Sequence, residues 1–210
     1  MVAASSSSLY QGWLPILDHP SAEDGRTILE RAVNALPASN ESFRRANAFL
    51  QLAIFERSQL DVRSLSTRTA GLAQRVDRVI PLLSLAIDGS LAAPELLGAT
   101  GSRSYLVVAQ NEDELRATGG FATSVGLLTI EDGKLGDLNF IDSYQVDDLN
   151  ADFAQPPDPL KNYMLAGYWL FRDANWSPDF PTSARQLASL YELGQHKKVD
   201  GVIALDQEMR

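Results

Sequence analysis

A short stretch of this sequence places a basic side chain close to two adjacent glycines: Arg116, followed by Gly119 and Gly120. A guanidinium group can hold a phosphate or a carboxylate through two parallel hydrogen bonds, which makes Arg the side chain best suited to grip an anion. Adjacent glycines let the backbone turn sharply and approach a ligand closely. The stretch therefore predicts either a small anion-binding loop or a tight turn whose Arg pairs with a nearby acid such as Glu114. It is not a P-loop, which ends in Gly-Lys-Ser/Thr.

A second polar stretch, RDANWSPDFP at residues 172–181, combines charged, amide and aromatic side chains. Aromatic rings beside polar groups are suited to line a groove that binds a sugar or a protein partner. In the alternative interpretation the Asp and Asn side chains hold the loop through bonds to the backbone, and the aromatic rings anchor it. The candidate binding residues from this stretch are Arg172, Asp173, Asn175, Trp176 and Asp179.

Four acids lie at the end of the predicted third strand and in the loop that follows it, and their oxygens suit a hard divalent cation. Their spacing is not that of an EF-hand loop, so a solvated acidic loop is favoured and no metal site is expected. Asp142 is the exception, because a position at a strand end would let it face Arg116 and Arg172. The four acids are Asp142, Asp147, Asp148 and Asp152.

The composition excludes several other chemistries. The chain has no cysteine and only two histidines, which removes disulfides, thiolate catalysis and the commonest zinc ligands. Net charge is −9, and residues 101–210 hold nine basic and seventeen acidic residues against nine and ten in residues 1–100. Such a field repels a polyphosphate backbone, so nucleic acid is not an expected partner. No run of about 18 apolar residues is present, so no membrane-spanning segment is expected in this chain.

The first half of the chain reads as helical. Residues 1–20 are serine-rich and predict an irregular leader. A helix is expected from Ser21, capped with the help of Asp24, to Leu36, where Pro37 would end it. Two further helices are expected at about 40–59 and 61–86, with a possible kink at Pro81. Residues 88–103 contain glycines and a proline and mark a boundary.

The second half alternates between strand and helix signals. Short apolar runs predict strands at 105–110, 121–130 and 199–205, and the Asp132-Gly133 pair predicts a hairpin turn into a third strand at 135–144. Residues 145–162 read as an acidic surface loop, and residues 164–171 as a strand or buried edge. Thr182 is expected to cap a helix that runs to residue 193 and ends at Gly194.

These elements predict an α/β fold, with a mixed sheet packed by helices, behind an N-terminal helical bundle or hairpin. The last strand follows a helix and is expected to return parallel to an earlier one. The predicted domains are an irregular leader at 1–20, a helical region at 21–98 and an α/β domain at 99–210. The final residues read as the beginning of a further element, so the α/β domain is expected to be incomplete at its C-terminal end.

The segments NEDELRATGGF (111–121) and RDANWSPDFP (172–181), with VDGVIALD (199–206), resemble an uncharacterised bacterial family known as a domain of unknown function. Members of that family typically have an N-terminal membrane helix, then a helical stretch, then this domain on the outer side of the membrane, often among envelope and exopolysaccharide genes. The resemblance covers roughly residues 75–210. It implies an extracytoplasmic location, a membrane anchor upstream in the parent protein, and a chain that is a fragment or a processed product.

The order of strands, Arg-bearing loop, hairpin and helix is also similar to the LytR-CpsA-Psr envelope ligases. Those enzymes transfer a glycopolymer from a polyprenyl pyrophosphate carrier to the cell wall, using Arg residues to grip the pyrophosphate and an Asp that assists with a divalent metal. By position, Arg116 corresponds to one of those Arg residues. Where that family has an Arg-Asp pair after the third strand, this chain has Asp142-Ser143-Tyr144.

Three functions follow as hypotheses. The first is a non-catalytic envelope module at the bacterial cell surface that binds a glycopolymer or a protein partner, with no cofactor. The second is a LytR-CpsA-Psr-like transferase, for which a divalent cation such as Mg²⁺ would be needed. The third is a structural subunit that assembles through its N-terminal helices. No complete catalytic set is visible in the sequence, so enzymatic activity is left open.

Overall fold

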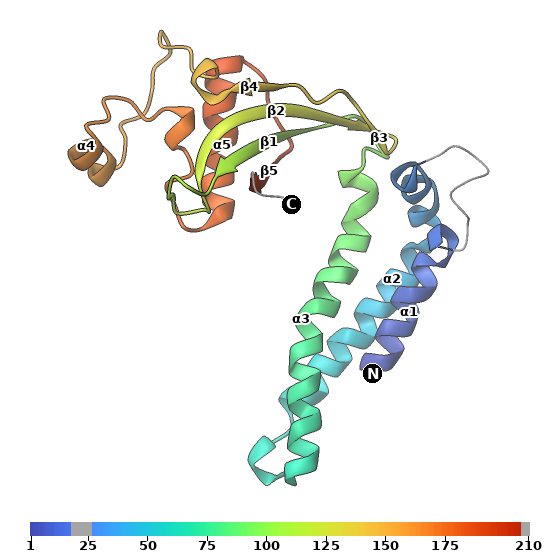
Figure 1. Cartoon of the computed structure of the whole chain (residues 1–210). Coiled ribbons are helices and arrows are strands. Elements are labelled where there is room, and N and C mark those ends of the chain that lie inside the picture. The colour runs from blue at the N-terminus through green and yellow to red at the C-terminus, as the bar shows by residue number, and fades with distance from the viewer. Residues whose placement is uncertain (18–26, 207–210) are drawn as a thin grey trace. The chain divides into compact units, whose positions relative to one another are not determined.

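The computed structural model of the chain describes residues 1–17 and 27–206 (Figure 1). It contains two compact units, and we describe each by itself. The helical unit comprises Met1–Ser102 with Glu131–Lys134, and the α/β unit comprises Arg103–Ile130 with Leu135–Arg210. The division after residue 102 lies close to the predicted boundary at 98/99. The prediction of helices followed by a mixed sheet with packing helices is confirmed.

The helical unit begins with α1 (Val2–Leu17), so the predicted irregular leader is wrong over these residues. The serines favour close helix packing instead of preventing helix formation. Ser5 is fully buried, and its hydroxyl donates a hydrogen bond to the Ala46 carbonyl at 2.7 Å. Gly12 lies against the ring of Phe43, where a Cβ atom would clash. Small side chains therefore let α1 lie directly along its neighbour.

The second helix, α2 (Ile28–Ser58), is continuous through Pro37, which the sequence predicted to end it. Thr27 caps this helix in a capping box with Glu30, whereas the predicted cap at Ser21 and Asp24 lies outside the described residues. A proline inside a helix removes one backbone hydrogen bond. Buried residues on both sides of Pro37, Leu36 and Phe43 among them, pack into one core, and this packing offsets the loss.

The third helix, α3 (Thr67–Leu96), follows the short 3-10 helix η1 (Val62–Ser64) and extends about ten residues beyond its predicted end. Gly89 and Pro94 lie within it and do not mark a loop. An 18-residue window of α3 has a mean hydropathy of 1.4, and by length and composition α3 could cross a membrane. Isolated charges interrupt the apolar residues of this helix without lowering their mean hydropathy, so it passes the test although it contains no uninterrupted run of about 18 apolar residues. Core helices of soluble proteins pass the same test, so this property alone assigns no membrane span.

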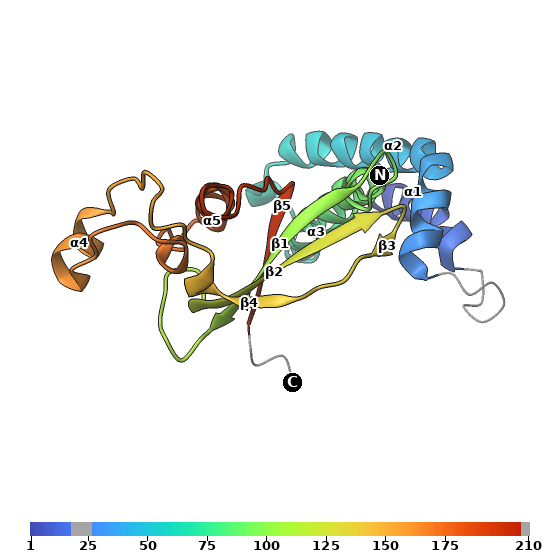
Figure 2. The ribbon, with the colours of Figure 1, turned by 90° about the horizontal axis from the view of Figure 1, so that it is seen from above.

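A mixed sheet forms the centre of the α/β unit. β1 (Arg103–Asn111) pairs antiparallel with β2 (Phe121–Glu131) and parallel with β5 (Gly201–Asp206). The order is β3-β2-β1-β5, with β4 also paired to β2. The predicted first, second and last strands are confirmed within a few residues, as is the parallel return of the last strand. Figure 2 shows β5, β1 and β2 side by side.

The third predicted strand is broken into β3 (Lys134–Leu135) and β4 (Phe140–Asp142). The predicted hairpin turn is present, with φ values of 50° at Asp132 and 75° at Gly133. Positive φ at both central residues matches the tight hairpin turn that follows the twist of the strands. The tip of this hairpin belongs to the helical unit: the backbone N–H groups of Asp132 and Gly133 donate to the carbonyls of Gly98 and Leu97 just beyond the end of α3.

Helix α5 (Phe180–Gln195) packs on the sheet and closes the core of the α/β unit. Asp179 caps this helix, not Thr182 as predicted, because the Asp179 carboxylate accepts from the Thr182 backbone N–H at 3.0 Å. The helix ends at His196, which has φ of 54°, not at Gly194. Buried residues of this core come from the sheet, from α5 and from the segment before α5, among them Leu106, Val108, Val125, Leu187, Leu190 and Phe171.

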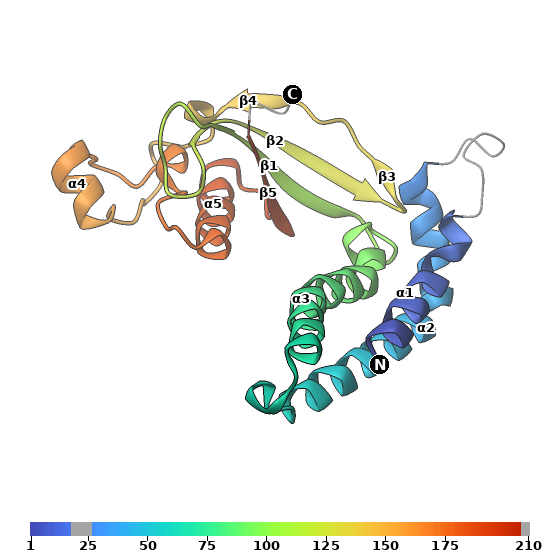
Figure 3. The ribbon, with the colours of Figure 1, turned by 60° about the horizontal axis from the view of Figure 1, so that its bottom comes forward.

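Residues 164–171, predicted as a strand or buried edge, form no strand. The short helix α4 (Asp158–Met164) ends at Leu165, which has φ of 55°, and an open loop follows. The ribbon views show α4 standing apart from the sheet (Figures 1 and 3). Apolar content alone misled the prediction here, because several of these apolar side chains, Leu165 among them, are exposed.

Asp200 joins the start of β5 to the start of β1. Its carboxylate accepts from the Ser104 backbone N–H at 2.8 Å and from the Arg103 guanidinium at 3.0 Å. These bonds lower the pKa of the Asp200 carboxyl, the Ser104 bond most strongly. A carboxyl group whose pKa is lower in the folded than in the unfolded state stabilises the fold above the unfolded pKa of about 3.9, and this stabilisation is lost as pH falls below that value.

We expect Asp200→Asn to be less stable than wild type at pH 7 by about 0.2–1 kcal/mol, the range of a surface ion pair. The difference between the two proteins should shrink as pH falls from about 4 towards 2, because wild-type Asp200 then becomes protonated. Urea unfolding followed by circular dichroism at several pH values measures this difference. A difference that stayed constant down to pH 2 would show that the carboxylate charge does not contribute.

Candidate functional site

The α/β unit contains a pocket of about 430 Å³ at which several separate segments meet. The loop after β1, the start of β2, the 3-10 helix η2 (Ser143–Gln145), α4 with its following loop, and the 3-10 helix η3 (Phe171–Asp173) all contribute. The pocket brings together the two arginines that the sequence analysis chose from stretches more than fifty residues apart. Its principal polar and aromatic lining residues are Arg116, Arg172, Asp173, Glu114, Tyr144 and Tyr168.

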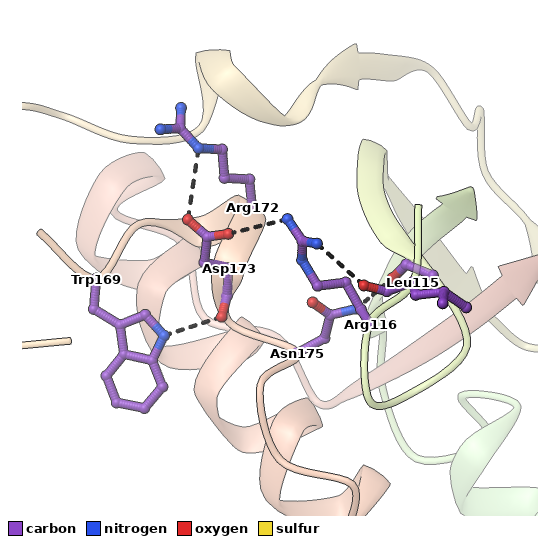
Figure 4. A network of polar contacts seen from close by, with 7 residues as sticks. Leu115, Arg116, Trp169, Arg172, Asp173 and Asn175 are labelled. Carbon is purple, nitrogen blue, oxygen red and sulfur yellow. Dashed lines mark hydrogen bonds and ion pairs between the residues drawn. The ribbon is translucent and has the colours of Figure 1, made fainter. Parts of the chain in front are cut away.

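Arg116 reaches the pocket from the loop that joins β1 to β2. Its guanidinium lies over the ring of Phe121, 5.1 Å from the ring centroid, and donates to the Leu115 carbonyl at 3.1 Å. A terminal nitrogen lies 3.7 Å from a carboxylate oxygen of Asp173 (Figure 4). The aromatic face and the carboxylate together hold the guanidinium in one orientation.

Arg172 approaches the same carboxylate from η3. Its Nε atom lies 3.6 Å from Asp173 Oδ2, and its guanidinium lies 4.5 Å from the ring centroid of Tyr144. Figure 4 shows the two guanidinium groups on different sides of Asp173. Both arginine side chains keep some solvent exposure, 20% for Arg116 and 31% for Arg172, so their charges are accessible from the pocket.

Asp173 is the buried centre of this arrangement. Its side chain is 11% exposed, and its main-chain carbonyl accepts from the Trp169 indole at 3.1 Å. One carboxylate thus serves two guanidinium groups, and both ion pairs are longer than a good charge-assisted hydrogen bond of about 2.7–2.9 Å. The triad of Arg116, Asp173 and Arg172 contains two positive groups and one negative group, so one positive charge is left without a partner inside the triad.

A second carboxylate, Asp147, lies behind the triad. It accepts from the Phe171 backbone N–H at 3.0 Å and is half-buried, so it does not belong to a solvated acidic loop as the sequence suggested. Burial raises the pKa of the Asp147 carboxyl, while the Phe171 hydrogen bond and the charge of Arg172 oppose that rise. Asp147 therefore positions η3, and with it both Arg172 and Asp173.

The end of α5 supports the same loop. Gly194 lies so close to the Val146 backbone that a Cβ atom would clash there. The Gln195 side-chain amide donates to the Val146 carbonyl at 2.8 Å and to the Gln145 carbonyl at 3.2 Å. The helix thereby fixes η2, which carries Tyr144 into the pocket. Gly194 was predicted as a helix end, and its observed role is to allow this close approach.

The two glycines near Arg116 do not form the predicted anion-binding loop. Gly120 is buried, a Cβ atom there would clash with the Asn111 backbone, and its carbonyl accepts from the Asn175 side chain at 2.6 Å. Gly119 has φ of 116°, which favours glycine, and lies beside Gln110 and Asp206 and not in the pocket. Asn175, fully buried, connects the two predicted motifs through this single bond, so its observed role is structural.

Three further candidate residues lie outside the pocket lining. Asp179 caps α5, and its hydrogen bonds to Thr182 lower the pKa of its carboxyl. Asp142 caps η2 by accepting from the Tyr144 backbone N–H at 2.9 Å, so it orients the residue that stacks on Arg172 without itself lining the pocket. Trp176 is half-buried and does not line this pocket.

Sequence reasoning missed the aromatic and apolar part of the site. Tyr144 and Tyr168 line the pocket and are 60% and 58% exposed, and α4 contributes Leu160 and Met164. One signal was available: Gly167 and Tyr168 interrupt an apolar stretch next to the charged motif, which is unusual for a buried strand. The stacking of Tyr144 on Arg172 joins residues 28 positions apart, and no local pattern predicts it.

The arrangement is suited to bind an anionic group beside a flat or apolar surface. Guanidinium groups supply directed hydrogen-bond donors, and the exposed rings supply a face for stacking. Within residues 1–17 and 27–206 there is no group of three or more His, Asp or Glu side chains placed to hold a metal ion. The described side chains also include no nucleophile paired with a histidine base in this pocket.

Comparison with known proteins gives one result. No curated protein and no solved structure matches this sequence. Residues 100–209, more than half of the chain, match a family described as a protein of unknown function, DUF4012. The matched region corresponds closely to the α/β unit and contains every residue of the pocket. The chain therefore belongs to the DUF4012 family of proteins of unknown function.

Proposed function

We propose that the α/β unit is an extracytoplasmic cell-envelope module that binds an acidic glycopolymer through the pocket around Asp173. The extracytoplasmic location rests on the resemblance of the two motifs to envelope proteins. The choice of an acidic ligand rests on one observation: Arg116 and Arg172 converge on a single carboxylate at a pocket of about 430 Å³. A ligand carboxylate or phosphate can share the two guanidinium groups that Asp173 leaves only partly satisfied.

The aromatic residues favour a sugar as the carrier of that anionic group. The exposed rings of Tyr144 and Tyr168 border the pocket, and amphipathic rings of this kind are suited to surfaces that are apolar in one part and wet in another. Two bases bordered by stacking surfaces match a uronic acid or a phosphate-bearing sugar unit. A protein partner with an acidic side chain beside an aromatic one would use the same groups.

Isothermal titration calorimetry with a uronic-acid oligosaccharide, oligogalacturonate, tests this proposal. The wild-type chain should bind oligogalacturonate and should not bind maltohexaose, a neutral oligosaccharide of similar size. Arg116→Gln and Arg172→Gln should each weaken binding by about tenfold or more, as expected when a charged hydrogen bond of 1.5–3 kcal/mol is lost. Arg185→Gln is the matched control, because Arg185 lies on α5 outside the pocket. Equal affinity for both sugars, or equal affinity of all variants, would contradict the proposal.

Asp173→Asn gives a prediction in the opposite direction. Without its carboxylate the two guanidinium groups face each other uncompensated, so the free protein should lose about 1–3 kcal/mol of stability. The same change removes the competitor for an incoming anion, so oligogalacturonate should raise the melting temperature of Asp173→Asn more than that of wild type. Differential scanning fluorimetry with and without the oligosaccharide measures both effects. If Asp173→Asn is less stable than wild type and oligogalacturonate does not raise its melting temperature, the triad is purely structural.

A second candidate function is a transferase that acts on a polyprenyl-pyrophosphate-linked glycopolymer. The observation that favours it is the apolar part of the pocket lining, because Leu160, Met164 and Leu165 line the same pocket as the two arginines. A pyrophosphate with a prenyl tail would match both parts, with Mg²⁺ as the expected cofactor. If geranyl pyrophosphate with Mg²⁺ stabilises wild type and neither arginine variant, while oligogalacturonate has no effect, this function replaces the first.

A further inference from the structure

The pocket around Asp173 also contains a carboxylate that no other side chain holds. Glu114 lines the pocket together with Arg116 and Arg172 and is exposed to solvent. The sequence suggested Glu114 as the acid that pairs with Arg116. In the structure Arg116 pairs with Asp173 instead (Figure 4). Among the described residues, no hydrogen bond or ion pair holds the Glu114 carboxylate, so it is available to a ligand.

A tight turn fixes the backbone that carries Glu114. The Glu114 backbone N–H donates to the Asn111 carbonyl at 3.2 Å, and the Asn111 side chain accepts from the Asp113 backbone N–H at 3.2 Å. Gly120 packs against the Asn111 backbone from the other side and is itself held by the buried Asn175 side chain. The turn is therefore attached to the same motif that supplies the acid and one base of the triad. A group on such a fixed backbone loses less conformational freedom when a ligand binds it.

The charged side chains that line the pocket balance one another. They are Glu114, Arg116, Arg172 and Asp173, and thus two of each sign. The positive charge that the triad leaves over therefore shares its pocket with a negative charge that has no partner. A ligand that carries only an anionic group satisfies the arginines and leaves Glu114 uncompensated. A ligand that carries an anionic and a cationic group is complementary to both.

An exposed aromatic ring at the same pocket also suits a cationic group. Tyr168 lines the pocket, is exposed, and packs against Phe153 with 5.8 Å between the ring centroids. This site already holds a cation against a tyrosine ring, because the Arg172 guanidinium lies over Tyr144. Within the described part of the chain no such cation lies over Tyr168. Its ring can therefore contribute a cation–π contact to an ammonium group of a ligand.

We propose that the pocket selects a zwitterionic sugar, in which an acidic glycopolymer unit also carries a free amine. The carboxylate or phosphate of the sugar binds Arg116 and Arg172, and its ammonium group pairs with Glu114. This inference rests on the proposed binding of an acidic glycopolymer and narrows that ligand to one class. Glu114 then determines specificity, because an acetylated amine has no charge to offer its carboxylate.

Isothermal titration calorimetry with a matched pair of hexasaccharides tests the inference. The first is hyaluronan hexasaccharide, which alternates glucuronic acid with N-acetylglucosamine, and the second is its de-N-acetylated form, in which each acetamide is a free amine. At about pH 6, where an amine carries its proton, wild type should bind the de-N-acetylated form about three- to fivefold more tightly, as expected for an exposed charge pair. Glu114→Gln should bind both forms equally and should bind hyaluronan at least as tightly as wild type does.

Asp113→Asn is the matched control, because Asp113 is an exposed acid of the same turn that does not line the pocket. This variant should keep the wild-type preference for the amine. Equal affinity of wild type for both forms, a preference that survives in Glu114→Gln, or an equal loss of preference in Asp113→Asn would overturn the inference. Each of these results leaves the proposed function standing, since the acidic sugar still binds. If wild type binds neither hexasaccharide, the inference is wrong, and the titration with oligogalacturonate decides the proposed function separately.

Discussion

Phe171→Ala is expected to lower the free energy of unfolding of the α/β unit by about 3–5 kcal/mol, the range for removal of a buried Phe ring. Phe171 is fully buried, and its ring lies 6.4 Å from that of Tyr191 on α5 in an edge-on contact. The residue directly precedes Arg172 and Asp173, and its backbone N–H is held by Asp147. The loss therefore combines a cavity in the core with a looser attachment of the binding residues.

Chemical denaturation followed by far-ultraviolet circular dichroism measures this loss, and peptide-level hydrogen exchange over residues 103–111 locates it. Phe180→Ala is the matched control, because Phe180 lies in the first turn of α5 and is 37% exposed. We expect that variant to lose much less stability. Similar losses in the two variants would show that the ring of Phe171 is not a central part of the core.

Phe43→Ala is expected to have an effect of similar size in the helical unit, again about 3–5 kcal/mol. Phe43 is 1% exposed, its ring centroid lies 6.3 Å from that of Trp13, and Gly12 packs against its ring. Its removal leaves a cavity at the place where α1 contacts α2. The attachment of α1 should weaken most, because α1 supplies both Trp13 and Gly12.

Hydrogen exchange over residues 2–17 and 28–58 reports this effect, and it should show faster exchange in α1 than in α2. Phe55→Ala provides the comparison, since Phe55 lies on the same helix and is 61% exposed. That variant should unfold close to wild type. If α1 kept wild-type protection in Phe43→Ala, the packing of α1 would depend on other contacts, such as the Ser5 hydrogen bond to Ala46.

The central strands could be predicted from sequence because their signals are local. YLVVAQ and FATSVGLLTI are β-rich apolar runs, and Asp132-Gly133 marks the turn between β2 and β3. The ends and breaks of the helices could not be predicted in the same way. Pro37 reads locally as a stop, whereas the buried residues on either side of it keep α2 continuous. The serines of α1 read locally as a leader, whereas their small size allows close packing.

The candidate site was predictable in part. The choice of Arg116 and Arg172 depended on residue type, and the structure places both at one pocket. Which carboxylate they share depends on tertiary structure: Asp173 lies near both guanidinium groups, whereas Asp147, which the sequence placed in a solvated acidic loop, is half-buried and accepts from the Phe171 backbone N–H. Asp142 and Asp179 illustrate the limit: an acid before a turn or a helix is as well suited to cap it as to bind a ligand.

The hairpin tip at Glu131–Lys134 has a consequence for any attempt to dissect this protein. The chain leaves the helical unit after Ser102, returns for these four residues and leaves again. A polypeptide that stops at residue 102 therefore loses the two backbone N–H groups that bind the Leu97 and Gly98 carbonyls. Expressing the two halves of the chain separately would therefore remove the hairpin tip from the helical unit. A recombinant helical half would need other donors for the Leu97 and Gly98 carbonyls.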